Sequence, residues 1–99
     1  MRIIYTELSI QQLQNIREYI SLDSKKTAIA HLSNIKNKIE ILSTYPYIGK
    51  INASVNSENI REYVVLGYKV IYQISNDKLY ILAIYKNIDF NEEDLSFLD

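Results

Sequence analysis

Two stretches in the first half of the chain repeat apolar residues every three or four positions. Between Leu8 and about Ile20, the apolar residues Leu13, Ile16 and Ile20 recur at this spacing, with polar side chains between them. In the second stretch the apolar positions step by four, three, four and three residues: Ala28, Leu32, Ile35, Ile39 and Leu42. Both spacings predict amphipathic helices that each bury one face. Because only the segment SLDSKK separates them, we expect an antiparallel helical hairpin.

The second half of the chain is richer in β-branched and aromatic residues and has a strand-like pattern. It predicts three strands at about Ile60–Leu66, Tyr68–Ser75 and Leu79–Tyr85. A short apolar run from Arg2 to Tyr5 predicts an opening strand. The resulting order, β-α-α-β-β-β, predicts an α+β domain in which the helical hairpin packs on one face of a small antiparallel sheet.

Polar and turn-forming residues mark the ends of these elements. Thr6 offers an N-cap hydroxyl for the first helix, and Asp23 or Ser24 offers one for the second. Pro46 ends the second helix, and Gly49 supplies a turn soon after it. Residues 50–59 are polar without a clear period and predict a loop. Between the strands, Gly67 permits a tight reversal and Asn76-Asp77 suits a hairpin turn.

Both faces of the last predicted strand are apolar. Strict alternation places Leu79, Ile81, Ala83 and Tyr85 on one face and Tyr80, Leu82, Ile84 and Lys86 on the other. One helical hairpin covers only one face of a sheet, so the other needs cover from the C-terminal residues, from loops or from a partner chain. A short helix at residues 91–98, with Leu95 and Leu98 on one side, is one source of such cover.

The chain has 99 residues and no cysteine, which predicts a single domain over residues 1–99 and excludes disulfides and thiolate sites. The first residues, MRIIYTE, contain no apolar signal region, and no segment is long enough to span a bilayer, so we expect a cytoplasmic protein. Charge is uneven along the chain. Five acids in the C-terminal tail, residues 89–99, leave 11 basic and 7 acidic residues in residues 1–88, a net charge of +4.

Few residues suggest a catalytic, metal-binding or phosphate-binding role. The single histidine, His31, lies beside the apolar stripe of the second helix with no metal-ligand spacing around it, which favours a structural role. No phosphate-binding glycine loop and no nucleophile elbow is present, and we expect neither a cofactor nor a metal. Arg61, together with Lys50, Lys69 and Lys86, is the better candidate, since such a cluster would attract phosphate.

Several weak motifs occur in one order along residues 1–88. They are the opening segment IIYTELSIQQLQNIREYI, a long second helix ending in Leu42, Pro46 and Gly49, then Ile60-Arg61-Glu62, the segment from Gly67 to Tyr72, and a final apolar strand ILAIYK. In this order and spacing, the chain resembles the RelE/ParE superfamily of toxins from bacterial type II toxin–antitoxin systems. It resembles the ParE branch, often described as plasmid-stabilisation proteins, more than the RelE branch.

The resemblance implies a small toxin that a cognate antitoxin neutralises by wrapping a segment around it. We expect the antitoxin to contact Tyr68, Tyr72, Tyr80, Leu82 and Ile84. ParE-like members poison DNA gyrase, so the resemblance implies that gyrase is the target. It also implies that the toxin acts by binding and not as an enzyme. The sequence leaves homo-oligomer formation open.

RelE-like members instead cleave mRNA on the ribosome with a cluster of Lys, Arg, and His or Tyr. Under that alternative, Arg61, Lys86 and Tyr85 form the catalytic set. An endonuclease must move protons, and the unperturbed pKa values of Lys and Tyr lie far above neutral. A third alternative is a non-toxic relative that only binds antitoxin, which the acidic tail and the low overall charge favour.

Overall fold

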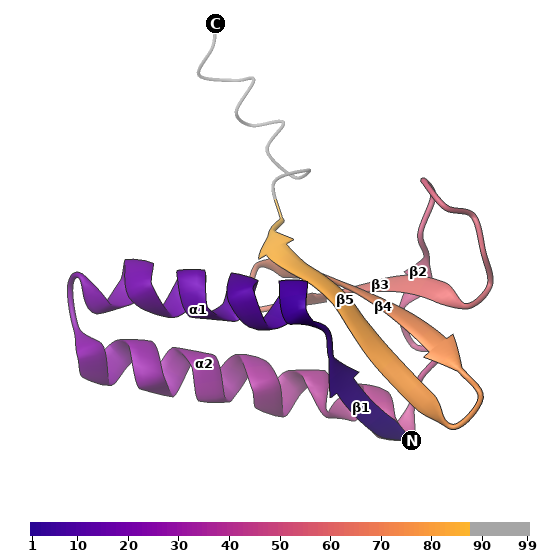
Figure 1. Ribbon diagram of the computed structural model, residues 1–99, viewed down its shortest axis with the longest axis horizontal. Helices are drawn as coiled ribbons and strands as arrows, with labels where there is room; N and C mark the ends of the chain where they lie inside the picture. Colours follow the sequence, from indigo (N-terminus) through magenta and orange to yellow (C-terminus); the bar gives the residue numbers. More distant parts are fainter. Residues whose placement is uncertain (88–99) are drawn as a thin grey trace, which may run out of the picture.

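The computed structural model describes residues 1–87, in which a helical hairpin lies on one face of a five-stranded sheet (Figure 1). The elements, in chain order, are β1 (Arg2–Tyr5), α1 (Glu7–Ser21), α2 (Lys25–Ile39), α3 (Ile41–Thr44), β2 (Lys50–Ile51), β3 (Ile60–Val65), β4 (Tyr68–Ser75) and β5 (Lys78–Lys86). The predicted α+β class and the predicted helical hairpin are confirmed. The predicted tail or short helix at residues 89–99 lies outside the described residues.

The strands are ordered β1-β5-β4-β3-β2, and all neighbours are antiparallel except β1 and β5. The sheet is therefore mixed, whereas the sequence predicted an antiparallel one. Strand β2 is a second difference, because residues 50–59 were expected to form a loop. Lys50 and Ile51 instead pair with Glu62 and Arg61 at the edge of the sheet. A strand of two residues is too short to produce a readable alternation.

Helix caps form where the sequence placed them. The Thr6 hydroxyl accepts a hydrogen bond of 3.3 Å from the Ser9 N–H, and the Ser24 hydroxyl accepts one of 3.1 Å from the Thr27 N–H. The second helix ends at Ile39, earlier than its apolar stripe suggests, and Leu42 lies in α3. The stripe nevertheless packs into one core, because Ile35, Ile39 and Leu42 are all fully buried in the same hydrophobic cluster.

A β-bulge in β5 changes which side chains face the helices. Ile71 lies opposite Ala83 and Tyr72 lies opposite Ile81, so Leu82 is an extra residue without a partner position on β4. Alternation restarts after a bulge, which moves every later side chain to the other face. Ile84 therefore joins Ile81 in the core, and the strict alternation predicted for this strand is wrong beyond Leu82.

The core lies between the helical hairpin and the sheet. Its helical members are Leu13, Ile35, Ile39 and Leu42, and its strand members are Val65, Val70, Tyr72, Ile74, Leu79, Ile81 and Ile84. Half-buried Ile3, Tyr5, Ile16, Leu32, Tyr63 and Tyr68 pack around this cluster. No helix within residues 1–87 combines the length and the apolar character needed to cross a membrane.

Candidate functional site

Arg61, the residue proposed for phosphate contact, is held by backbone carbonyls. Its guanidinium donates hydrogen bonds to the carbonyls of Glu58 at 2.9 Å, Gly49 at 2.9 Å and Tyr47 at 3.3 Å. The same group stacks on the Tyr47 ring, with 4.9 Å between the guanidinium carbon and the ring centroid. Arg61 therefore fixes the chain that leads from α3 into β2, and most of its donors are already used.

Lys86 and Tyr85 lie far from Arg61. Arg61 pairs with Tyr72 on β4, while Lys86 pairs with Tyr68, four residues away along that strand. Four residues of strand span about 13 Å. Consecutive residues of a strand point to opposite faces, so Tyr85 and Lys86 diverge. Lys86 instead lies over the Tyr68 ring, 5.4 Å from its centroid. The structure thus does not assemble the three candidate nuclease residues into one site.

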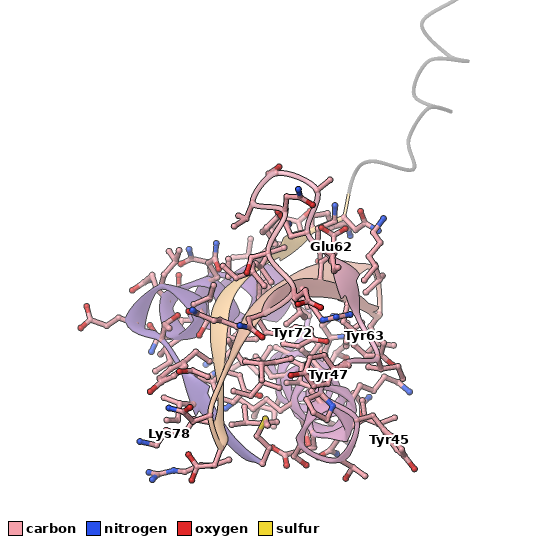
Figure 2. The ribbon with its side chains drawn as sticks, turned by 90° about the vertical axis from the view of Figure 1, so that its right-hand side faces the viewer. Tyr45, Tyr47, Glu62, Tyr63, Tyr72 and Lys78 are labelled. Atoms are coloured by element: carbon pink, nitrogen blue, oxygen red, sulfur yellow. The ribbon has the colours of Figure 1, made fainter. Side chains whose placement is uncertain are left out.

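Tyr72 also holds the loop between α3 and β2 in place. Its buried hydroxyl donates to the Pro46 carbonyl at 2.7 Å and accepts from the Gly49 N–H at 3.0 Å. Burial raises the pKa of Tyr72, although the Gly49 N–H bond and the Arg61 charge act in the opposite direction. On the same loop, Tyr45 and Tyr47 are exposed at the surface (Figure 2).

Of the five side chains expected to contact an antitoxin, two are unavailable. Tyr72 is 0% exposed and Ile84 is 1% exposed, and both face the helices. The assignment of these two residues to a partner surface is wrong for the folded chain, because the bulge turns Ile84 inward and the Pro46 loop covers Tyr72. Tyr68, Tyr80 and Leu82 are half-buried and stay candidates.

The single histidine packs against another aromatic ring. The His31 ring packs at a tilt against the Tyr68 ring, with 5.7 Å between centroids. Within residues 1–87, no group of three or more His, Cys, Asp or Glu side chains is arranged to hold a metal ion.

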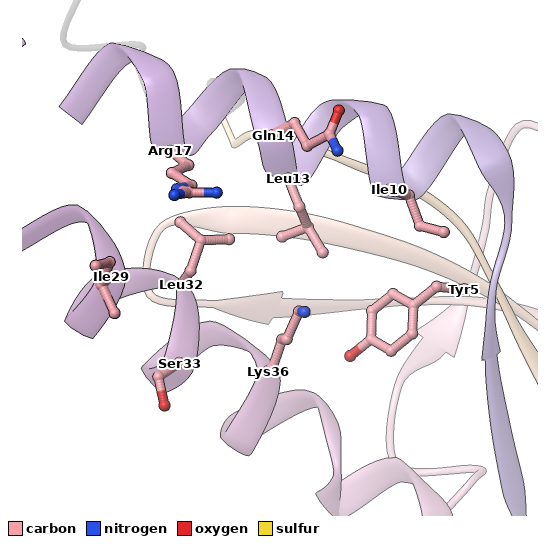
Figure 3. A pocket seen from close by; sticks show the side chains of 9 residues that line it. All are labelled: Tyr5, Ile10, Leu13, Gln14, Arg17, Ile29, Leu32, Ser33 and Lys36. Carbon is pink, nitrogen blue, oxygen red and sulfur yellow. The ribbon is translucent and has the colours of Figure 1, made fainter. Parts of the chain in front are cut away.

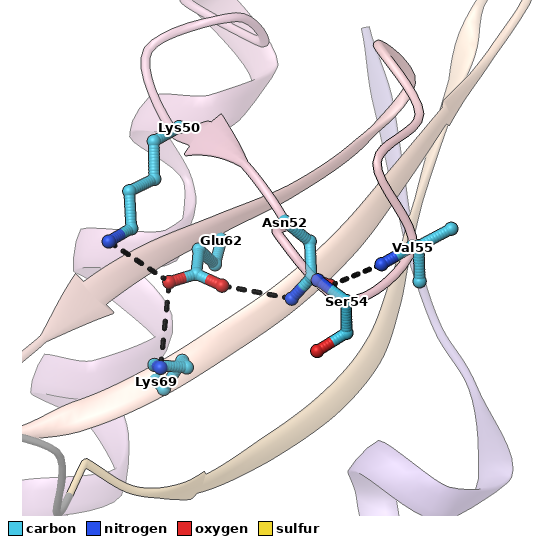
Figure 4. A network of polar contacts seen from close by, with 6 residues as sticks. All are labelled: Lys50, Asn52, Ser54, Val55, Glu62 and Lys69. Carbon is cyan, nitrogen blue, oxygen red and sulfur yellow. Dashed lines mark hydrogen bonds and ion pairs between the residues drawn. The ribbon is translucent and has the colours of Figure 1, made fainter.

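The face of the sheet turned away from the helices carries a polar network near the β2 edge (Figure 4). Glu62, only 8% exposed, lies 3.5 Å from the ammonium groups of both Lys50 and Lys69. Its second carboxylate oxygen accepts a hydrogen bond of 2.9 Å from the Asn52 side chain. The two lysines that the sequence grouped with Arg61 thus surround a carboxylate of their own and are not gathered beside Arg61.

A hollow lies on the helical hairpin, and sequence reasoning missed it. It has a volume of about 740 Å³ and is lined by Tyr5, Ile10, Leu13, Gln14, Arg17, Ile29, Leu32, Ser33 and Lys36 (Figure 3). We call it the hairpin groove. Ile10 and Ile29 are 46% and 60% exposed, although both are large and apolar. Their positions outside the buried stripes were the signal in the sequence that could have revealed this surface.

The hairpin groove is basic as well as apolar. Arg17 and Lys36 are its charged residues, and neither forms an ion pair with any residue of the described part of the chain. Lys36 lies over the Tyr5 ring, with 5.9 Å between the ammonium nitrogen and the ring centroid. Burial, with a smaller contribution from Glu40, raises the pKa of Tyr5 to about 12. The buried Tyr5 hydroxyl has no hydrogen-bond partner within residues 1–87.

Comparison with known proteins identifies the family. The family model described as the ParE toxin of the type II toxin–antitoxin system, parDE, matches residues 3–87. No curated protein sequence is similar enough to count as a match. A solved structure described as the chromosomal ParDE TA system from P. aeruginosa shares the fold, with a TM-score of 0.73 and 17% sequence identity over 87% of this chain and 95% of that chain. Because the family match spans most of its length, this chain belongs to the ParE toxin family of type II toxin–antitoxin systems.

Proposed function

We propose that this toxin acts in the cytoplasm by binding DNA gyrase, without hydrolytic chemistry of its own. The observation that carries the proposal is the environment of Arg61, within a chain that belongs to the ParE family. Arg61 directs its hydrogen bonds to the Tyr47, Gly49 and Glu58 carbonyls and is separated from Lys86. Because most of its donors are bonded to backbone carbonyls, the Arg61 guanidinium is poorly placed to bind a phosphate group. This environment favours a binding function over phosphoryl transfer.

The surface above Arg61 is suited to binding a large target. Exposed tyrosines combine a broad apolar ring with a polar tip and lose little conformational entropy when they are buried in an interface. Tyr45 and Tyr47 are 58% and 57% exposed and stand on a loop that Tyr72 and Arg61 hold in place. A surface fixed in advance lowers the entropic cost of association.

Membership of the family implies a cognate antitoxin, and the hairpin groove is the surface that we assign to it. The groove has a volume of about 740 Å³ and exposes Ile10 and Ile29 to solvent. Half-exposed Tyr68, Tyr80 and Leu82 are secondary candidates for antitoxin contact. An antitoxin that covers the groove would bury apolar surface that is costly to leave in water.

Pulse-labelling of DNA and protein synthesis in bacteria, after induced expression of the chain, tests the target. We expect DNA synthesis to fall first, with a DNA-damage response, and co-expressed antitoxin to restore both. An earlier collapse of protein synthesis would contradict the proposal and favour the mRNA endonuclease, with Arg61, Tyr85 and Lys86 as the residues to mutate. Unchanged synthesis of both polymers would instead indicate a non-toxic relative.

A further inference from the structure

The turn between β3 and β4 holds a leucine in a backbone conformation that leucine rarely adopts. Leu66 has a φ of +51°, and Gly67, the next residue, has a φ of +86°. Two-residue hairpin turns with positive φ at both central positions favour Asn-Gly, because a side chain in the left-handed region brings its Cβ close to the following carbonyl oxygen. The leucine side chain therefore lowers the stability of this turn.

Two other positions of the chain show which residue this conformation usually selects. Besides Leu66, the non-glycine residues with positive φ within residues 1–87 are Asn56 and Asn76, at +56° and +57°. Asn76 lies in the turn between β4 and β5, so the two hairpin turns of one sheet differ at their left-handed position. Asparagine tolerates this region through local hydrogen bonds of its side chain, which leucine cannot form. Turn geometry thus does not explain a leucine at position 66.

Burial does not explain it either. Leu66 is 45% exposed and lies outside the hydrophobic core. Two neighbours extend the exposed apolar surface, Val64 at 50% and Tyr85 at 44%. Val64 lies opposite Lys69 on β4, and Lys69 lies opposite Tyr85 on β5, so these three side chains form a row on one face of the sheet, next to the turn. We call Val64, Leu66 and Tyr85 the turn patch.

Lysines flank the turn patch on both faces of the sheet. Lys69 lies within the row, 3.5 Å from the Glu62 carboxylate. Lys86 follows Tyr85 on β5 and therefore points to the opposite face, where it lies over the Tyr68 ring. An apolar surface with a cationic margin is complementary to an apolar pocket that carries acidic residues at its rim.

From these observations we propose that Leu66 is a binding residue for the toxin's protein target and inserts into an apolar pocket with an acidic rim. The inference rests on the proposed function, in which that target is gyrase. Strained residues cluster at binding and switch sites, where the strain belongs to the function. Leu66 follows Arg61 by five residues, about 16 Å of strand, so the turn patch and the loop that Arg61 holds fit within one interface of ordinary size.

The antitoxin is the rival occupant of the turn patch. The hairpin groove, which we assign to the antitoxin, is lined by residues of β1, α1 and α2. Val64 and Tyr85 lie on the other face of the sheet, because their neighbours Val65 and Ile84 are buried against the helices. The turn patch is therefore a separate surface, which favours a separate partner.

The test compares the full chain with variants at single leucines. Leu66→Asn introduces a residue that suits the left-handed region, and Leu66→Met keeps an apolar side chain of similar size. The toxin concentration that halves supercoiling by purified gyrase should rise about tenfold for Leu66→Asn and change by less than about twofold for Leu66→Met. Leu22→Asn is the matched control and should inhibit like the wild-type chain, since Leu22 is an 81% exposed leucine with a right-handed backbone.

Thermal unfolding separates binding from packing. Leu66→Asn should unfold at the wild-type temperature or up to about 4 °C above it, because the strain in the turn is relieved. Asn76→Leu, the reverse exchange at the other hairpin turn, should unfold about 4 °C lower. A lower unfolding temperature for Leu66→Asn would overturn the inference, by showing that the leucine is retained for packing. An unchanged temperature for Asn76→Leu would remove the strain on which the inference depends.

These outcomes are distinct from a failure of the proposed function. If the wild-type chain and Leu66→Asn inhibit gyrase equally, only the inference fails. A loss of antitoxin affinity with unchanged gyrase inhibition would also overturn it and would assign the turn patch to the antitoxin. If the wild-type chain does not inhibit gyrase, the proposed function fails, and growth arrest in cells tests Leu66 against another target. Leu66→Asn should then arrest growth less than Leu66→Met and Leu22→Asn, and equal arrest by all three would overturn the inference.

Discussion

The Tyr72 hydroxyl accepts a hydrogen bond of 3.0 Å from the N–H of Gly49, 23 residues earlier in the chain. This contact joins the middle of the sheet to the loop that carries Tyr45 and Tyr47. The same hydroxyl donates to the Pro46 carbonyl at 2.7 Å, so one buried side chain satisfies two backbone groups. The exposed tyrosines therefore owe their fixed position to a side chain that is itself fully buried.

Tyr72→Phe should lower the free energy of unfolding by about 2 kcal/mol, because it leaves a buried donor and a buried acceptor unpaired. Urea unfolding followed by circular dichroism measures the change. Tyr85→Phe is the control, since Tyr85 is 44% exposed and its hydroxyl forms no hydrogen bond within the described chain. Equal stabilities of the two variants would show that the Tyr72 hydroxyl does not support the loop.

Gly49→Ala should lower the free energy of unfolding more than Gly67→Ala does. A Cβ at Gly49 would lie 2.6 Å from both the Glu62 carbonyl oxygen and the Tyr72 hydroxyl, so backbone must move to admit it. At Gly67 a Cβ meets nothing within 4 Å, and the cost is only that of a φ of +86°, about 1 kcal/mol. Overpacking at Gly49 should cost about 3 kcal/mol, which thermal unfolding of the two variants would resolve.

Tyr5→Phe should leave stability unchanged or slightly raised at pH 7, because it removes a buried hydroxyl that has no partner within residues 1–87. Folding raises the pKa of Tyr5 from 10.0 to about 12. The unfolded chain therefore loses the phenol proton first, and stability falls as pH rises through this interval.

The contribution of Tyr5 to that fall is measured by comparing the wild-type chain with Tyr5→Phe at several pH values between 9 and 12. The variant should gain about 1 kcal/mol relative to the wild-type chain across the range, a value reduced for the partial exposure of Tyr5. Tyr68 and Tyr72, whose pKa values burial also raises, titrate in both proteins and cancel in the comparison. Parallel stability curves would contradict the assigned environment of Tyr5.

Arg61→Ala should destabilise the chain by about 2 kcal/mol, since it leaves three carbonyls without their donor. Lys86→Ala should change stability by less than about 0.5 kcal/mol, because Lys86 is exposed. Chemical denaturation of the two variants measures both changes in the free energy of unfolding. A stable Arg61→Ala variant that had lost toxicity would instead indicate that Arg61 contacts the target or a substrate directly.

The fold was predictable because its main elements carry strong, regular patterns. The apolar stripe from Ala28 to Leu42 predicts one long buried face, and most of it is fully buried whether or not the helix is broken at Glu40. The bulge at Leu82 was not predictable, because the segment from Leu79 to Ile84 is apolar throughout and fits either face. Strand β2 was missed because two residues produce no period.

The candidate site was predicted less well, for a physical reason in each case. Arg61 is flanked by ordinary strand residues, and the carbonyls that hold it come from a loop that only the folded chain brings near. The hairpin groove exposes two apolar residues, Ile10 and Ile29, which lie three residues before Leu13 and Leu32 but were not among the apolar positions used to predict the helices.

The most direct test of the central claim is supercoiling by purified DNA gyrase in the presence of the purified chain. If this toxin binds gyrase, supercoiling should fall with increasing toxin, and stoichiometric antitoxin should restore it. Full gyrase activity at a large excess of a folded chain that still halts growth in cells would contradict the claim, and the target would have to be sought elsewhere.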